Sequence, residues 1–215
     1  VSVPEGLVAL LERLVLRLGG ALAIITGRRI EDVDRLLAPL RPIAAGVHGA
    51  ELRLAGGGMV EAAAAPVPEG VVTAARRIAG DDKRVRVEAK GGAVAVHFRA
   101  CPEAGPRLAA ALADVVEAHG DKLILRPGRM VLEVVPRAVS KGGALEALME
   151  LPAFQGRRPL MIGDDVTDES ALAAAVRLGG AGLKVAGEHF AAEDADFAGT
   201  AAVRAFLAAL TERAP

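Results

Sequence analysis

One stretch decides how the rest of the chain is interpreted: Leu160-Met161-Ile162-Gly163-Asp164-Asp165-Val166-Thr167-Asp168-Glu169-Ser170. An apolar run ends at a glycine, and four carboxylates follow within six residues with no basic residue among them. Carboxylates this close repel one another, and a folded protein keeps them only where something offsets the repulsion. A strand that ends in Gly-Asp-Asp at the carboxyl edge of a sheet is typical of a divalent-cation site with oxygen ligands. The alternative is a solvated, acidic helix start.

The composition limits both the fold and the partners. A length of 215 residues, 52% of them hydrophobic, suits one large core with an inserted module. Aromatic residues make up 2% and the net charge is −1, so we expect neither a base-stacking platform nor a basic field for nucleic acid or an anionic membrane. Cys101 is the single cysteine, which favours a reducing, cytoplasmic setting. No apolar run reaches the ~18 residues of a membrane span, and we expect no signal peptide.

Strands and helices alternate at both ends of the chain. The first part predicts a helix, a strand, a helix and a strand over residues 5–18, 21–25, 30–39 and 42–47. The last part predicts a helix, a strand, a helix, a strand and a helix over residues 141–149, 158–162, 168–178, 182–185 and 201–212. This alternation predicts an α/β fold with a doubly wound parallel sheet and ligands at the carboxyl ends of its strands.

The middle of the chain has a different pattern, with alternating polar and apolar residues typical of antiparallel strands. A hairpin is expected over residues 51–60. Further on we expect helices over 69–79 and 103–119 and strands over 84–88, 93–99, 123–125 and 130–134. The predicted organisation is therefore a core in two parts, residues 1–65 and 137–215, with an α+β insert over residues 66–136.

Three positions follow or begin elements of the predicted core. Thr26 follows a buried strand, Lys141 begins a helix, and Asp164 and Asp165 follow another strand. A hydroxyl, an ammonium at a helix start and an acid pair that can hold Mg²⁺ are the requirements of phosphoryl transfer. Taken singly, Thr26 is more often a helix N-cap and Lys141 a solvated lysine, so the interpretation rests on the set.

The chain resembles the haloacid-dehalogenase-type phosphatases. The matching motifs of that family are Ile25-Thr26-Gly27-Arg28, Ser140-Lys141-Gly142 and Gly163-Asp164-Asp165-Val166-Thr167-Asp168-Glu169. Within the family the chain is similar to the trehalose-6-phosphate phosphatases, through Gly46-Val47-His48-Gly49-Ala50-Glu51, Val87-Glu88-Ala89-Lys90, Val96-His97-Phe98-Arg99 and Val131-Leu132-Glu133-Val134-Val135-Pro136. The similarity runs from about residue 3 to 208.

The resemblance implies a Rossmann-like core, a cap formed by the insert, and a role for each matching residue. Thr26 would bind the phosphoryl group, Lys141 would neutralise it, and Asp164 would bind Mg²⁺ directly while Asp165 supports the metal and Lys141. Asp168 would cap its helix or orient the loop. The substrate would also contact a larger set of residues: Gly27, Arg28, His48 and Gly49 from the core, and Glu88, Lys90, Arg99, Arg129 and Glu133 from the cap. The family often carries lysine at position 129.

Less specific interpretations remain open for several of these residues. Without the resemblance, Lys90, Arg99 and Arg129 would be assigned to a solvated sheet face. His97 could equally be a packed strand residue, and His119 and His189 have no site context.

The first motif of the family, Asp-x-Asp-Gly-Thr, is not present in the 215 residues. Its first Asp is the nucleophile of the family, and its strand lies between the strands expected at 21–25 and 158–162. Omitting this strand would leave two unpaired strand edges in the core. We therefore expect that the natural protein carries a further strand and loop upstream, and that these two strands do not pair with each other.

The resemblance implies Mg²⁺-dependent hydrolysis of trehalose 6-phosphate through an aspartyl phosphate. A small-molecule substrate and a cytoplasmic setting are expected, with trehalose-6-phosphate synthase as a candidate partner. Two alternatives stay open. One is another sugar phosphatase, of the sucrose-phosphate or mannosylphosphoglycerate type, and the other is a non-catalytic regulatory domain that binds a sugar phosphate.

Overall fold

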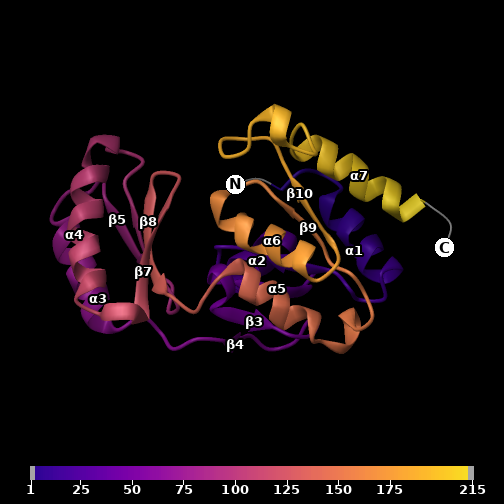
Figure 1. The fold of residues 1–215 in the computed structure, drawn as a ribbon, viewed down its shortest axis with the longest axis horizontal. Coiled ribbons are helices and arrows are strands. Elements are labelled where there is room, and N and C mark those ends of the chain that lie inside the picture. Colours follow the sequence, from indigo (N-terminus) through magenta and orange to yellow (C-terminus); the bar gives the residue numbers. More distant parts are fainter. Residues whose placement is uncertain (1–2, 213–215) are drawn as a thin grey trace. The chain divides into compact units, whose positions relative to one another are not determined.

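The computed structural model describes residues 3–212, which form two compact units. The first, the core unit, extends to Glu61 and resumes at Ser140, and the second, the insert unit, comprises Ala62–Val139 (Figure 1). The borders differ by a few residues from the expected 65/66 and 136/137. At the second border, the Arg126 guanidinium donates to the Val139 carbonyl and the Arg137 amide donates to the Lys122 carbonyl, so this segment belongs to the insert unit.

The core unit contains helices at both ends of the chain and short strands between them. Its helices are α1 (Leu7–Arg17), α2 (Ile30–Leu37), α5 (Lys141–Met149), α6 (Glu169–Arg177) and α7 (Thr200–Glu212). Its strands are β1 (Ala23–Ile25), β2 (Ile43–Gly46), β3 (Glu51–Arg53), β9 (Leu160–Gly163) and β10 (Ala181–Lys184), and β4 (Glu61–Ala62) lies at the border between the units. Short 3₁₀ turns are η1 (Val47–Gly49), η4 (Pro152–Phe154), η5 (Val166–Asp168) and η6 (Ala192–Asp194).

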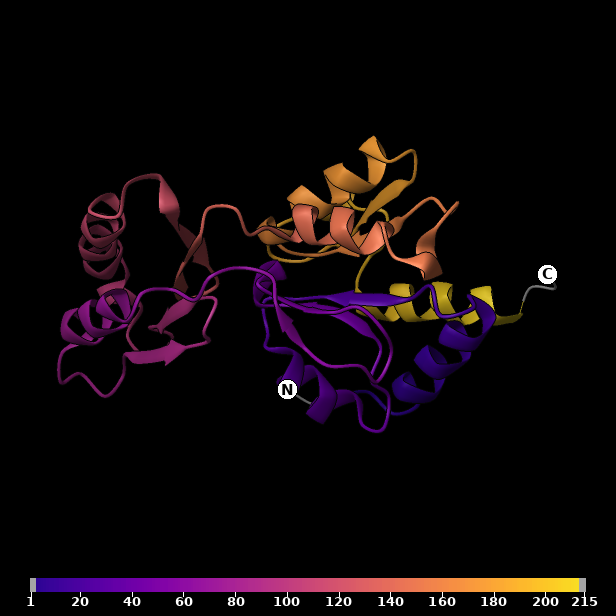
Figure 2. The same ribbon diagram turned by 90° about the horizontal axis from the view of Figure 1, so that it is seen from below.

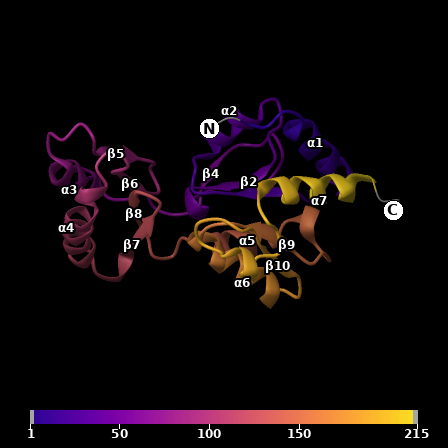
Figure 3. The same ribbon diagram turned by 90° about the horizontal axis from the view of Figure 1, so that it is seen from above.

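The parallel sheet predicted for the core is present in two parts. β1 pairs with β2 in parallel, β3 joins β2 antiparallel, and β4 follows in the same sheet. β9 and β10 form a second parallel pair. Within residues 3–212, β1 and β9 belong to different sheets and do not pair, as expected from the missing motif (Figure 3). The predicted α/β class with parallel strands in the core is confirmed.

Apolar side chains of β1 alternate between two layers of helices. Ile24 packs on a cluster from α1, α2 and α7 that includes Leu14 and Val33, and α1 and α7 lie side by side (Figure 2). Ile25 faces the opposite layer and packs on Leu148 of α5. This period-two alternation is expected of a strand buried on both faces, and it leaves the carboxyl ends of the strands as the polar edge.

The insert unit is a four-stranded antiparallel sheet with two helices on one face. Its elements are α3 (Glu69–Ala79), β5 (Arg86–Ala89), β6 (Val94–His97), α4 (Gly105–Glu117), β7 (Leu123–Gly128) and β8 (Val131–Pro136), with 3₁₀ turns η2 (Pro102–Ala104) and η3 (Gly120–Lys122). The strand order is β5-β6-β8-β7. Val96 and Val134 point toward Leu108 of α4 in one buried cluster, so the alternate residues of these strands lie on the face opposite the helices.

None of the helices within residues 3–212 combines the length and the apolar character that crossing a bilayer requires.

Candidate active site

The loop after β1 presents a hydroxyl at the carboxyl edge of the sheet. The Thr26 amide donates to the Ala45 carbonyl (2.9 Å), which continues the β1–β2 ladder by one residue. Thr26 Oγ1 accepts a hydrogen bond from the Arg28 amide (3.2 Å). Because this bond uses a lone pair of the hydroxyl, its proton remains available to donate to an anion. The Arg28 side chain is exposed.

The turn η1 after β2 packs on this loop and on the start of α5. The Val47 amide donates to the Arg28 carbonyl (2.8 Å), and the His48 amide donates to the Thr26 carbonyl (2.9 Å). On the other side, a side chain at Gly49 would lie 3.0 Å from the Ser140 carbonyl oxygen. The turn therefore touches two segments that are more than 100 residues apart in the sequence.

Helix α5 begins with a capped turn and a buried lysine. Ser140 is the N-cap, and its hydroxyl accepts from the Gly143 amide (3.0 Å), which is the usual way in which a serine satisfies a free amide at a helix start. Lys141 is 7% exposed. Its Nζ donates to Oδ1 of Asp168 at 2.6 Å, so the ammonium is neutralised inside the core unit.

The acidic loop after β9 is organised by Asp168. Its Oδ2 accepts hydrogen bonds from the amides of Asp164 (3.0 Å) and Asp165 (3.1 Å), while its Oδ1 accepts from Lys141. A side chain at Gly163 would lie 2.5 Å from the Cβ of Asp168, so glycine is required where the strand enters the loop. Asp168 therefore orients the loop, which was one of its two expected roles.

The carboxylates of Asp164 and Asp165 differ in their partners. Asp165 accepts from the Val166 amide (2.7 Å) and from the Thr167 hydroxyl (3.2 Å), so its oxygens stabilise its own turn. Asp168, and not Asp165, makes the direct contact with Lys141. Asp164 is exposed, and its side chain makes no hydrogen bond or ion pair to the rest of residues 3–212.

This donor set fits Mg²⁺ as a partial site. Mg²⁺ is commonly bound by one or two carboxylates together with waters and substrate phosphate oxygens. Within residues 3–212 there is no cluster of three or more His, Cys, Asp or Glu side chains that could hold a metal ion. Asp164 offers a carboxylate without a competing hydrogen bond, and Asp165 lies beside it.

In the insert unit, three of the predicted sugar-binding residues lie on the sheet face opposite the helices. Cross-strand register aligns Glu88 with Ala95 and Ala95 with Glu133. Lys90 Nζ donates to Oε1 of Glu133 at 2.9 Å, and both side chains are about nine-tenths buried. Glu88 is 3.0 Å from Nε2 of His97. The structure therefore brings Glu88, Lys90 and Glu133 onto one polar face.

The other two predicted residues, Arg99 and Arg129, lie outside the strands that form this face. Arg99 is exposed and follows the end of β6. Arg129 lies in the turn between β7 and β8, where it lines a groove of about 470 Å³ on the side of α4 together with Phe98 and Met130.

Two residues of the polar face were not assigned a binding role from the sequence. Arg126 lies directly across from Glu133, and burial lowers the pKa of its guanidinium while the Glu133 carboxylate acts in the opposite direction. The alternation of Leu123, Ile124, Leu125 and Arg126 could have identified it. His97, for which the sequence left a packed strand position open, pairs with Glu88.

The two remaining histidines lie outside the sites described so far. His189 contacts Oε1 of Glu169 at 2.8 Å in the core unit, and Nδ1 of His119 is 2.7 Å from the Val115 carbonyl in the insert unit. The contact between His189 and Glu169 joins a loop to a helix, and no sequence spacing predicts it.

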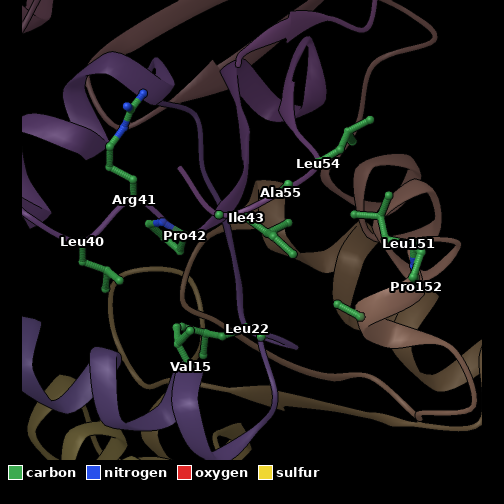
Figure 4. A pocket seen from close by; sticks show the side chains of 13 residues that line it. Val15, Leu22, Leu40, Arg41, Pro42, Ile43, Leu54, Ala55, Leu151 and Pro152 are labelled. Carbon is green, nitrogen blue, oxygen red and sulfur yellow. The ribbon is translucent and has the colours of Figure 1, made fainter. Parts of the chain in front are cut away.

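An apolar cavity of about 380 Å³ lies elsewhere in the core unit (Figure 4). Leu22 and Ile43 line it, and they mark the amino ends of β1 and β2. Leu151 and Pro152 contribute from the segment after α5. Thr26 and His48 follow the carboxyl ends of the same strands, so this cavity is separate from the candidate phosphate site.

Comparison with known proteins identifies relatives over most of the chain. The sequence model of the trehalose-phosphatase family matches residues 1–202. The chain is 38% identical over 189 residues to a probable trehalose-phosphate phosphatase of Sinorhizobium fredii and 37% identical over 190 residues to the trehalose-6-phosphate phosphatase of Escherichia coli. Each match covers 86% of this chain and 70% of the relative.

Solved structures share the fold. The C-terminal domain of the trehalose-6-phosphate phosphatase of C. albicans aligns with a TM-score of 0.79 at 18% identity, over 99% of this chain and 85% of that domain. Neighbours of this kind have the haloacid-dehalogenase-type fold with a cap domain, in agreement with the predicted fold class.

Proposed function

The chain belongs to the trehalose-phosphatase family, and from this premise we propose that it acts on trehalose 6-phosphate as a Mg²⁺-dependent phosphatase. One observation of the structure carries the proposal. Contacts connect all three polar segments of the core unit, from Thr26 through η1 to Ser140, and from Lys141 to Asp168 and the amide of Asp164. A hydroxyl, an ammonium and a carboxylate without a competing hydrogen bond therefore belong to one edge of the core unit.

Each residue of this edge has a proposed role in binding the phosphate. Thr26 donates its hydroxyl proton to a phosphate oxygen, and Arg28 and Lys141 neutralise negative charge that grows during the transfer. Asp164 holds Mg²⁺ with Asp165 beside it, and the bound metal supplies further neutralisation of the phosphate oxygens. Asp168 keeps the loop and Lys141 in place.

The sugar half of the substrate is assigned to the polar face of the insert unit. Glu88, Lys90 and Glu133 offer charged acceptors and donors to hydroxyl groups, and such charge-assisted hydrogen bonds are the stronger ones. We include Arg99 and Arg129 as outer contacts. These assignments rest on the family pattern and on the shared face of the first three residues.

The proposed route forms and then hydrolyses an aspartyl phosphate. The nucleophile would be the first Asp of the Asp-x-Asp-Gly-Thr motif, which the 215 residues do not contain. Its carboxylate would attack phosphorus as the bond to the sugar oxygen breaks, and the second Asp would protonate that oxygen. Water would then release phosphate. Residues 1–215 supply binding, orientation and charge neutralisation to this sequence of steps.

The experiment is to measure phosphate release with Mg²⁺ present from trehalose 6-phosphate, sucrose 6-phosphate and mannosylphosphoglycerate. It compares the product of the complete reading frame with the chain of residues 1–215. We expect release from trehalose 6-phosphate by the first protein if an Asp-x-Asp motif precedes Val1, and none by the second. Phosphate release from sucrose 6-phosphate or mannosylphosphoglycerate, without release from trehalose 6-phosphate, would overturn the substrate assignment. Binding without turnover by both proteins would instead favour a regulatory domain.

We also propose a cytoplasmic setting, because Cys101 is a buried free thiol and free thiols persist in reducing compartments. A trehalose-6-phosphate synthase is the corresponding source of substrate and a candidate partner.

A further inference from the structure

The turn η1 contains an unusual backbone conformation. Val47 and His48 have φ values of 49° and 58°, in the left-handed region that non-glycine residues seldom adopt, with Asn, Asp and His found there more often than the others. Val47 is β-branched, which makes its conformation especially unfavourable. Both residues are buried, with exposures of 0% and 4%. Such strain persists where surrounding contacts determine it, and it is frequently found at functional sites.

The strained residues hold the Thr26–Arg28 loop from two directions. The Val47 and His48 amides donate to the carbonyls of Arg28 and Thr26, at 2.8 and 2.9 Å. In addition, the His48 ring lies directly over Gly27, where a Cβ would be 2.7 Å from both Cε1 and Nε2. The ring therefore occupies the space of the missing side chain and restricts the peptide groups on either side of Gly27.

We infer that His48 is a positioning residue for the phosphate loop rather than a direct substrate contact. This inference rests on the proposed function in taking the Thr26–Arg28 loop as the phosphate loop. The imidazole fixes the peptide around Gly27, so that the Thr26 hydroxyl and the Arg28 side chain keep the spacing that an anion requires. Gly49 connects the same turn to the Ser140 carbonyl at the start of α5, and His48 thereby also limits movement between Thr26 and Lys141.

A double-mutant cycle tests the packing of the ring on Gly27, with inorganic phosphate as the probe and residues 1–215 as the protein. We expect His48→Ala to weaken phosphate binding about fivefold or more, because small displacements of positioned groups reduce affinity and rate. Gly27→Ala should be at least as harmful while His48 is present. In the double variant the added methyl group no longer meets the ring, so its affinity should match that of His48→Ala. If the loss of phosphate affinity in the double variant equalled the sum of the losses in the two single variants, the ring and Gly27 would act independently, and the inference would be overturned.

A second pair of variants separates the ring from the backbone. His48→Asn keeps a residue that tolerates positive φ but removes the ring, and we expect it to bind phosphate as weakly as His48→Ala. His119→Ala removes a histidine of the insert unit that contacts Val115 and should leave phosphate binding unchanged. Hydrogen exchange at the Val47 and Arg28 amides should accelerate in His48→Asn with little change in Tm, which a merely structural role would not produce.

The outcomes distinguish this inference from the proposed function. Wild-type affinity for phosphate in His48→Asn, or no phosphate binding by the wild-type chain, would overturn the positioning role. The other outcome is that the affinity for inorganic phosphate depends on His48 but the product of the complete reading frame does not hydrolyse trehalose 6-phosphate. In that case the positioning role is supported and the proposed substrate is wrong.

Discussion

Nζ of Lys141 lies 2.6 Å from Oδ1 of Asp168, and the two side chains are only 8% and 6% exposed. The other oxygen of this carboxylate accepts hydrogen bonds from the Asp164 and Asp165 amides. One side chain thus neutralises the buried ammonium and shapes the acidic loop. The pair spans 27 positions of sequence and joins α5 to the segment that follows β9.

Replacing Asp168 by Ala should lower the free energy of unfolding by about 3–5 kcal/mol, because it leaves Lys141 charged and buried without this partner. Urea unfolding measures the change. The control is Glu169→Ala, which removes a neighbouring, mostly exposed carboxylate that contacts His189 and should cost ~1 kcal/mol or less. A loss for Asp168→Ala no greater than that of the control would contradict the account.

Gly163→Ala should also destabilise the core unit, by about 1–3 kcal/mol, since the added methyl group would lie 2.5 Å from the Cβ of Asp168. Gly187→Ala is the matched control, because no atom lies within 4 Å of a Cβ built there and its φ is not in the left-handed region. Thermal unfolding compares the two variants. If Gly163→Ala were as stable as Gly187→Ala, the close packing of Asp168 on the strand end would be disproved.

Asp164→Asn should weaken Mg²⁺ binding roughly tenfold or more, because it removes one of the few carboxylates available to the ion. Asp165→Ala should instead lower stability by about 0.5–2 kcal/mol, since its oxygens accept the Val166 amide and the Thr167 hydroxyl. Calorimetric Mg²⁺ titration and urea unfolding of both variants separate the two roles. Retention of full Mg²⁺ affinity by Asp164→Asn would rule out Asp164 as the direct ligand.

In the product of the complete reading frame, Lys90→Met should raise the KM for trehalose 6-phosphate about tenfold or more while the affinity for inorganic phosphate stays the same. The change removes a cation that donates to the largely buried Glu133 carboxylate. Lys122→Met, at an exposed lysine of the same unit, is the control. An equal effect of Lys90→Met on phosphate affinity would show that the variant acts on the whole protein and not on sugar binding.

The pattern of apolar residues in the sequence was enough to predict individual helices and strands of the core unit. Helix α5 was predicted over the same residues, 141–149, and the structure adds Ser140 as its N-cap. Strand β7 was predicted too short. It was expected to end at residue 125, whereas it continues through Gly128 and the reversal is made at Met130, whose φ is 54°. That conformation of a methionine has no sequence signal.

The candidate site was predictable in its residue types but not in its partners. The motif pattern identified Lys141, Asp164 and Asp165, whereas Glu88 and Glu133 were implied by the family resemblance, with which the alternation of β5 and β8 agrees. The sequence did not indicate that Asp168 pairs with Lys141, because the path of the η5 turn decides which of several neighbouring carboxylates reaches the ammonium. The strained backbone of His48 was likewise invisible, since it depends on packing against Gly27.

The most direct test of the central claim is calorimetric binding of trehalose 6-phosphate, trehalose and inorganic phosphate to residues 1–215 with Mg²⁺ present. We expect trehalose 6-phosphate to bind at least about tenfold more tightly than either trehalose or phosphate, because its phosphate and its sugar hydroxyls each contribute binding free energy. In Lys141→Met, trehalose 6-phosphate should no longer bind more tightly than trehalose. Equal affinities for trehalose 6-phosphate and trehalose in the wild-type chain would contradict the account.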